Sequence, residues 1–227
     1  MESDAAMSTA PGIAIAESAA RRPTTQLEHY RDDGPAARLL GATAGLRIPL
    51  PPLPLALIGA AGLFAAVAVE RGGASDGTIA AAVAWFVLWA GVSSGRPHSD
   101  RFAWALPAVM RLGEYGALIW IGATIGESAS AGAFALIAAL AFRHYDLVYR
   151  SRFQGRPPAA WLDVAAGGWD GRLIMVTLLL VAGALPAGLF VLAGVLGVVF
   201  VSECVASWAG HAVGAVSIYE DEEDEGD

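Results

Sequence analysis

The stretch AFRHYDLVYRSRFQGR, residues 141–156, decides how this chain is expected to fold, because it ends a long apolar run with an abrupt cluster of Arg, His, Asp and Tyr. Arg143, Asp146 and Arg150 follow at spacings of three and four, so on a helix they share one face, while His144 points to a neighbouring face. This ending predicts an apolar helix that leaves a membrane at its cytoplasmic boundary.

The composition also indicates an integral membrane protein. Hydrophobic residues make up 56% of the 227 residues, 16% are charged, and the mean hydropathy is +0.53. An average soluble domain is about 45–50% apolar and about 25% charged. The net charge of -8 comes mostly from the final segment EDEEDEGD, residues 220–227. The chain has no dinucleotide-binding, P-loop or G-x-S-x-G motif, which argues against those soluble chemistries, and its single Cys204 has no partner for an intrachain disulfide.

Six apolar runs predict an all-α, polytopic membrane fold. A membrane-spanning helix needs about 20 residues, with 17–25 usual, and the first, third and sixth runs reach this length. Pro186 and Gly188 predict a turn between the last two runs. Five helices is the alternative, since the third run, and the last two taken together, can each be one or two elements. The runs cover residues 50–69, 78–92, 102–126, 129–142, 172–185 and 187–208.

The arginines predict the orientation of these helices. All fourteen basic residues are Arg, and basic residues near membrane helices are retained on the cytoplasmic side. With the amino terminus inside, twelve of the fourteen fall in cytoplasmic segments, Arg71 falls outside, and Arg111 lies within a helix. We therefore expect about six transmembrane helices with both termini cytoplasmic, in a multi-pass protein of the plasma membrane.

The two ends of the chain differ from its centre. Residues 1–48 are rich in Ala, Thr, Pro and charge, and we expect a cytoplasmic arm that is either disordered or carries a short amphipathic helix near its end. Residues 49–212 form the predicted six-helix membrane domain. Residues 213–227 form a predicted acidic, disordered tail.

Arg111 and Glu114 are predicted to lie deepest in the membrane. They stand three residues apart, so they share a helix face and can pair. Arg111 is ten residues beyond Arg101, which places it about 15 Å into the membrane if that whole stretch is helical. We interpret the two residues as an intramembrane ion pair that either fixes helix packing or marks a transport path.

A second set of ionisable residues falls near the cytoplasmic side, where the topology allows it to converge on one site. Guanidinium groups match phosphate oxygens, and carboxylates can hold a divalent ion that bridges those oxygens. Simpler explanations exist for the same residues, namely an interfacial belt of arginines and a helix cap at Asp170. The candidates for anion or head-group binding are Arg143, His144, Asp146, Arg150, Asp170, Arg172 and Glu203.

Two segments carry a resemblance to a known family. FRHYDLVYR, residues 142–150, followed by GGWDGRLIM, residues 167–175, resembles an uncharacterised actinobacterial membrane domain over roughly residues 35–215. That domain often occurs carboxy-terminal to nucleotidyltransferase and CDP-alcohol phosphatidyltransferase domains, so the resemblance implies a role in phospholipid or lipid-linked precursor metabolism. The phosphatidyltransferase motif itself, D-G-x-x-A-R with two later Asp residues, is not matched, because Asp170 and Gly171 are followed by RLIMVTLLLVAG.

Three functions are consistent with these patterns. The first is an accessory domain that binds anionic lipid or phosphate-containing head groups. Its partners are membrane lipids and, by the resemblance, a phosphatidyltransferase or nucleotidyltransferase; a nucleic-acid partner is not expected. The second is a membrane enzyme of the CDP-alcohol phosphotransferase type with a divergent site, which is the one case that needs a divalent cation. The third is a small transporter built around Arg111 and Glu114.

Overall fold

Each apolar run forms a helix in the computed structural model, which describes residues 30–70, 73–96, 101–153 and 160–224. These residues contain no strand, so the all-α prediction is confirmed. Two short helices, α2 and α7, and three 3-10 turns accompany the long helices. The helices are α2 (Pro35–Thr43), α3 (Pro52–Val69), α4 (Asp76–Val92), α5 (Leu106–Ile125), α6 (Glu127–Phe153), α7 (Ala160–Ala165), α8 (Gly168–Val181) and α9 (Leu185–Asp224), and the turns are η1 (Gly45–Arg47), η2 (Ser93–Gly95) and η3 (Ala103–Ala105).

Three helices are long and apolar enough to cross a membrane. They are α3, the part of α6 from Glu127 to Arg150, and the part of α9 from Leu185 to Gly210. α4 is apolar but slightly shorter. α5 has 20 residues but carries two charged side chains, and α8 has 14 residues, so these two are less clearly spans by length and composition.

Local sequence accounts for where the long helices begin and end. Ser75 caps α4, because its hydroxyl oxygen accepts the Thr78 N–H at 3.1 Å. α5 ends at Gly126, whose φ of 133° suits a residue without a Cβ.

The break between the last two runs is present, but it lies earlier than the turn predicted at Pro186 and Gly188. The turn is at Gly183, with φ 69°, and both predicted residues lie in α9. Pro186 is in the first turn of α9, where a missing N–H costs no helical hydrogen bond.

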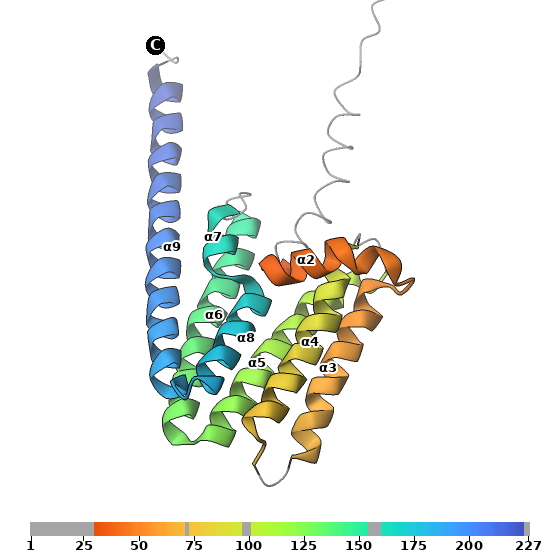
Figure 1. Ribbon diagram of the computed structural model, residues 1–227. Coiled ribbons are helices and arrows are strands. Elements are labelled where there is room, and N and C mark those ends of the chain that lie inside the picture. The colour runs from red at the N-terminus through yellow and green to blue at the C-terminus, as the bar shows by residue number, and fades with distance from the viewer. Residues whose placement is uncertain (1–29, 71–72, 97–100, 154–159, 225–227) are drawn as a thin grey trace, which may run out of the picture.

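The six long helices run alternately up and down, so the chain returns to one end of the bundle after every second helix (Figure 1). α2 lies across this end, which we call the α2 end (Figure 1). The segments after α4 and after α6 also lie there, and α9 extends past it. The segments that carry most of the arginines therefore gather at the α2 end.

The core of the bundle is apolar and tightly packed. Phe86 of α4 packs against Trp169 of α8, with ring centres 5.2 Å apart. Gly113 of α5 makes this possible, because a Cβ there would lie 2.2 Å from the Phe86 ring. The helices are thus joined by close contacts as well as by apolar burial.

The folded unit begins earlier in the chain than the predicted membrane domain. Ala37 and Gly41 of α2 are buried against the bundle, so the short helix weighed for the end of the arm is present, and residues 30–48 belong to the fold. Residues 1–29 lie outside the described part. At the other end, α9 continues to Asp224, into the segment expected to be a disordered tail. No proline follows Pro186, and extending a formed helix is easier than nucleating one.

Arg111 lies nearer the end of its helix than the sequence suggested. The interpretation assumed helix from Arg101, but α5 begins at Leu106. Arg111 is therefore only about 7–8 Å along α5 from its start. It lies at the α2 end and not near the middle of the bundle.

Candidate functional site

The segment Tyr30–Gly34 enters the bundle at the α2 end and is held mainly through its backbone. Asp32 has φ 56°, a left-handed conformation that Asp tolerates better than most residues. Its carbonyl accepts the Trp169 N–H at 3.1 Å. Arg111 donates to the carbonyls of Tyr30 and Arg31 at 3.0 and 3.3 Å. These bonds fix the Asp32 side chain inside the protein.

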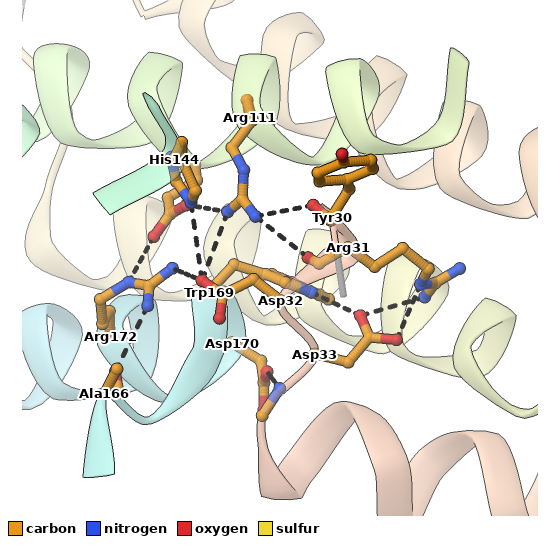
Figure 2. A network of polar contacts seen from close by, with 12 residues as sticks. Tyr30, Arg31, Asp32, Asp33, Arg111, His144, Ala166, Trp169, Asp170 and Arg172 are labelled. Atoms are coloured by element: carbon orange, nitrogen blue, oxygen red, sulfur yellow. Dashed lines mark hydrogen bonds and ion pairs between the residues drawn. The ribbon is translucent and has the colours of Figure 1, made fainter. Parts of the chain in front are cut away.

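Arg172 of α8 joins two buried carboxylates that come from distant parts of the chain (Figure 2). Its Nε donates to Glu114 Oε1 at 2.7 Å, and its Nη2 donates to Asp32 Oδ2 at 2.7 Å. Its remaining Nη1 reaches the carbonyl of Ala166 at 3.3 Å. All three charged side chains are buried: the exposed fraction is 2% for Arg172, 0% for Glu114 and 5% for Asp32.

Arg111 and His144 complete this group. Arg111 Nη1 donates to Glu114 Oε2 at 2.9 Å, which is the pair expected from their spacing, and lies 3.6 Å from Asp32 Oδ2. His144 Nδ1 is 2.7 Å from the Tyr115 hydroxyl, and its Nε2 is 3.6 Å from Asp32 Oδ2. We call Asp32, Arg111, Glu114, His144 and Arg172 the central network.

The central network balances two guanidinium groups against two carboxylates. Burial alone raises the pKa of Asp32, but Arg172, His144 and Arg111 outweigh burial and hold this pKa well below its ordinary value of 3.8. Asp32 is therefore ionised at neutral pH. A buried pair of this kind is expensive to break, because a lone charge is left without water.

Asp170 is a helix cap, but for a different helix from the one expected. The sequence suggested that it caps its own helix, α8. Its two carboxylate oxygens instead accept the N–H groups of Gly34 and Ala37 at 2.6 and 2.9 Å, at the start of α2. α8 itself begins after Gly167, a residue in the left-handed conformation, and no side chain caps this helix.

Backbone contact brings the start of α2 against the start of α8. A Cβ on Gly168 would lie 2.1 Å from the Gly34 nitrogen, and a Cβ on Gly34 would lie 1.9 Å from the Gly167 oxygen. Only glycine fits at these positions. Trp169 adds a side-chain bond, because its Nε1 donates to Asp33 Oδ1 at 2.8 Å.

A second group of charges joins α6 to α9, and we call Asp146, Arg150 and Glu203 the α6–α9 network. Arg150 donates to Asp146 Oδ2 at 2.5 Å and to Glu203 Oε1 at 2.7 Å, with a further short contact to the other Glu203 oxygen. The Cys204 thiol donates to Asp146 Oδ1 at 3.2 Å.

Arg143 lies on the same face of α6 as the α6–α9 network. Its guanidinium carbon is 5.6 Å from the centre of the Phe200 ring of α9, within the range of a cation–π interaction.

The seven candidate residues thus gather near the α2 end but divide between these contacts. His144 and Arg172 belong to the central network, Asp170 caps α2, and the other four lie between α6 and α9. Each arginine of the two networks already has carboxylate partners, so an added anion would compete with them. A divalent ion shared by Asp146, Asp170 and Glu203 has no such cluster to bind: no group of three or more His, Cys, Asp or Glu suited to a metal occurs in the part of the chain that the structure describes.

Between their two ends the described helices carry little charge. α5 contains no Asp, Glu, Arg or His after Glu114, α8 contains none after Arg172, and α4 carries only Asp76, at its first residue, at the opposite end. In α6 the opposite end holds only Glu127, at the first residue. A polar path for an ion or polar solute through the bundle would need such groups along its length.

The outer surface of the α2 end presents basic residues. Arg38 of α2 and Arg47 of η1 are exposed, and α2 contains no acidic residue. Arg96 donates to the carbonyl of Gly45 and so ties η1 to the end of α4. Leu39, beside Arg38, is 65% exposed, which suits a helix whose outer face meets the boundary between lipid and water.

Several residues of these contacts were not among the candidates. Asp32, Asp33, Arg31, Tyr115 and Trp169 all take part. A signal for the first three was present: Arg31-Asp32-Asp33 precedes Gly34-Pro35, which is a helix start in a chain that is poor in charge. Nothing in the sequence paired Tyr115 with His144.

A family model matches residues 21–225, and its description is a family of unknown function, DUF5941. The match covers most of the chain, so the protein belongs to this family. No curated protein and no solved structure matches it.

Proposed function

We propose that this DUF5941 member is an accessory membrane domain that crosses the plasma membrane six times and binds anionic lipid at its α2 end. Both termini then lie in the cytoplasm. The observation that carries the proposal is the position of α2, which lies across the end of the bundle where the arginines gather (Figure 1). Arg38 of α2 and Arg47 of η1 are exposed there. Basic residues on the cytoplasmic side are what membrane insertion favours.

The burial of charge supports Arg38 and Arg47 as the lipid-contacting residues in place of the arginines inside the bundle. Arg111, Arg150 and Arg172 face carboxylates at hydrogen-bonding distance. Arg38 and Arg47 are exposed, and α2 and η1 contain no acidic residue. An exposed basic residue near an anionic membrane surface contributes about 1 kcal/mol to binding.

The acidic carboxy-terminal segment does not oppose this arrangement. It begins at Glu220, ten residues beyond the last residue of the apolar part of α9, Gly210. Ten residues of helix are about 15 Å long, which carries the acids away from the membrane surface. The lack of charged residues along the helices between the α2 end and Asp76 and Glu127 at the opposite end favours this lipid-binding function over a transporter.

The lipid-binding part of the proposal is tested with purified protein in mild detergent. Mixtures of phosphatidylglycerol and phosphatidylcholine with equal chains are added, and the bound lipids are identified by native mass spectrometry. We expect a preference for phosphatidylglycerol that falls by up to about 30-fold when Arg38 and Arg47 are both changed to Gln. Arg101→Gln is the matched control, because Arg101 is exposed at the same end but not on α2. Equal preference in the wild type and the double variant contradicts the proposal.

The orientation is tested by labelling single cysteines in a Cys204→Ser background. Thr43→Cys on α2 and Ala182→Cys in the α8–α9 turn are both exposed positions. A membrane-impermeant maleimide added to intact cells is expected to modify position 182 and to spare position 43. Modification of position 43 from outside shows that the α2 end does not face the cytoplasm.

A further inference from the structure

The outer face of the bundle has an apolar groove between α4 and α8. It has a volume of about 290 Å³, and its walls are formed by Ala80, Ala84 and Leu88 on one side and by Ile174 and Leu178 on the other. Leu40 of α2 closes it at the α2 end. We propose that this groove holds one acyl chain of an anionic phospholipid of the cytoplasmic leaflet, with its phosphate at the exposed Arg38 of α2.

The chemistry of the walls favours a hydrocarbon chain. The lining is apolar apart from Thr177, and the Thr177 hydroxyl already donates to the carbonyl of Leu173 at 2.8 Å. A water molecule in the groove would find no polar partner there. An empty groove would lose the dispersion contacts of its walls, which a methylene chain restores.

The length and position of the groove fit a lipid of one leaflet. From Ala80 to Leu88 the groove follows eight residues of α4, or about 12 Å, and the hydrocarbon of one leaflet is about 15 Å deep. The groove starts directly beneath α2, because Leu40 also sits on Gly91 near the end of α4: a Cβ there would lie 2.8 Å from the Leu40 side chain. A chain in the groove therefore has its head group beside α2.

The charge at the mouth selects an anionic head group. Arg38 is exposed two residues before Leu40 and carries the charge nearest to it along α2. Asp33, which lies just before α2, pairs with Arg31, and Asp170 accepts the first N–H groups of α2. An uncompensated guanidinium at head-group depth attracts phosphate.

This inference rests on the proposed function in that the bundle must span a membrane. The experiment fills the groove and counts retained lipids. The wild type, Ala84→Trp and Ala81→Trp are purified in mild detergent with phosphatidylglycerol, and tightly bound lipids are counted by native mass spectrometry at increasing activation energy. Ala84 lines the groove, whereas Ala81 is exposed on the same helix outside it. We expect the wild type and Ala81→Trp to keep one phosphatidylglycerol that Ala84→Trp loses.

A second variant guards against misfolding. Ala80→Leu fills less of the groove and is expected to lower retention at least fivefold, while circular dichroism shows unchanged helix content. Equal retention in all variants overturns the groove as a lipid site. If phosphatidylglycerol is still preferred through Arg38 and Arg47, that result leaves the proposed function standing. If the wild type keeps a groove lipid but shows no preference for phosphatidylglycerol, the groove stands as a lipid site and the proposed function is wrong.

Discussion

Replacing Arg172 with Leu removes the cation that joins the two buried carboxylates of the central network. Arg111 is then the guanidinium left to both, at 2.9 Å from Glu114 and 3.6 Å from Asp32. One carboxylate of the two is left undercompensated inside the protein. Breaking a buried ion pair by removing one partner costs about 3–5 kcal/mol.

This cost converts to a large change in melting temperature. In a chain of this size, 1 kcal/mol shifts the Tm by about 2–4 °C, so Arg172→Leu is expected to lower the Tm by roughly 6–20 °C. The assay is thermal unfolding in detergent followed by tryptophan fluorescence, to which the buried Trp169 beside the network responds.

A double-mutant cycle separates the ion pair from general damage. Glu114→Leu in the Arg172→Leu background removes the stranded carboxylate and leaves Arg111 opposite Asp32, so we expect part of the stability to return. The coupling between the two changes is expected to be about 1–3 kcal/mol. Arg38→Leu, on the exposed face of α2, is the control and is expected to change the Tm little. A loss below 2 °C for Arg172→Leu, or strictly additive effects, refutes the reasoning.

Three further predictions concern the same end of the bundle. Asp170→Ala removes the acceptor for the first N–H groups of α2, so α2 amides are expected to exchange hydrogen faster and stability to fall by about 1–2 kcal/mol; unchanged exchange contradicts the capping role. Arg150→Leu leaves the buried Asp146 and the partly buried Glu203 without their shared cation between α6 and α9, and we expect a loss of about 3 kcal/mol in denaturant titrations, with Arg150→Lys recovering part of it. The lowered pKa of Asp32 adds stability that is present above its ordinary value of 3.8 and is lost as the pH falls through its lower folded value. Asp32→Asn is therefore expected to lower the Tm at pH 7 and to weaken its fall below pH 4; an identical pH profile argues against an ionised Asp32.

The helices could be predicted because each one has a recognisable pattern in its own local sequence. Apolar runs bounded by Gly, Pro and charge gave the long helices, and the arginines predicted which segments share an end. The fourth apolar run ends near Phe142, but the helix was expected to continue through FRHYDLVYR, residues 142–150. α6 does continue, to Phe153, and its polar residues find partners on α5, α9 and the amino-terminal segment.

The contacts of the site could be predicted only where both partners lie on one helix. Arg111 with Glu114, and Asp146 with Arg150, follow from spacings of three and four residues. Arg172 with Asp32 spans 140 residues, and no periodicity relates them. The anion-binding role of the buried arginines stays a prediction. Because those arginines already have carboxylate partners, the exposed Arg38 of α2 and Arg47 of η1 are the better candidates.

The docking of the amino-terminal segment against α8 has a consequence for how the protein is synthesised and folded. Gly34 packs against the backbone of Gly167 and Gly168, and Asp32 accepts a hydrogen bond from Arg172. About three quarters of the chain must therefore be synthesised before the amino-terminal segment has its docking site. The four long helices α3 to α6 are all synthesised before α8, so residues 30–34 have no docking partner while those helices form. Docking of this segment is thus a late maturation step, and a chain that stops before α8 leaves residues 30–34 without their partners and open to proteases and chaperones.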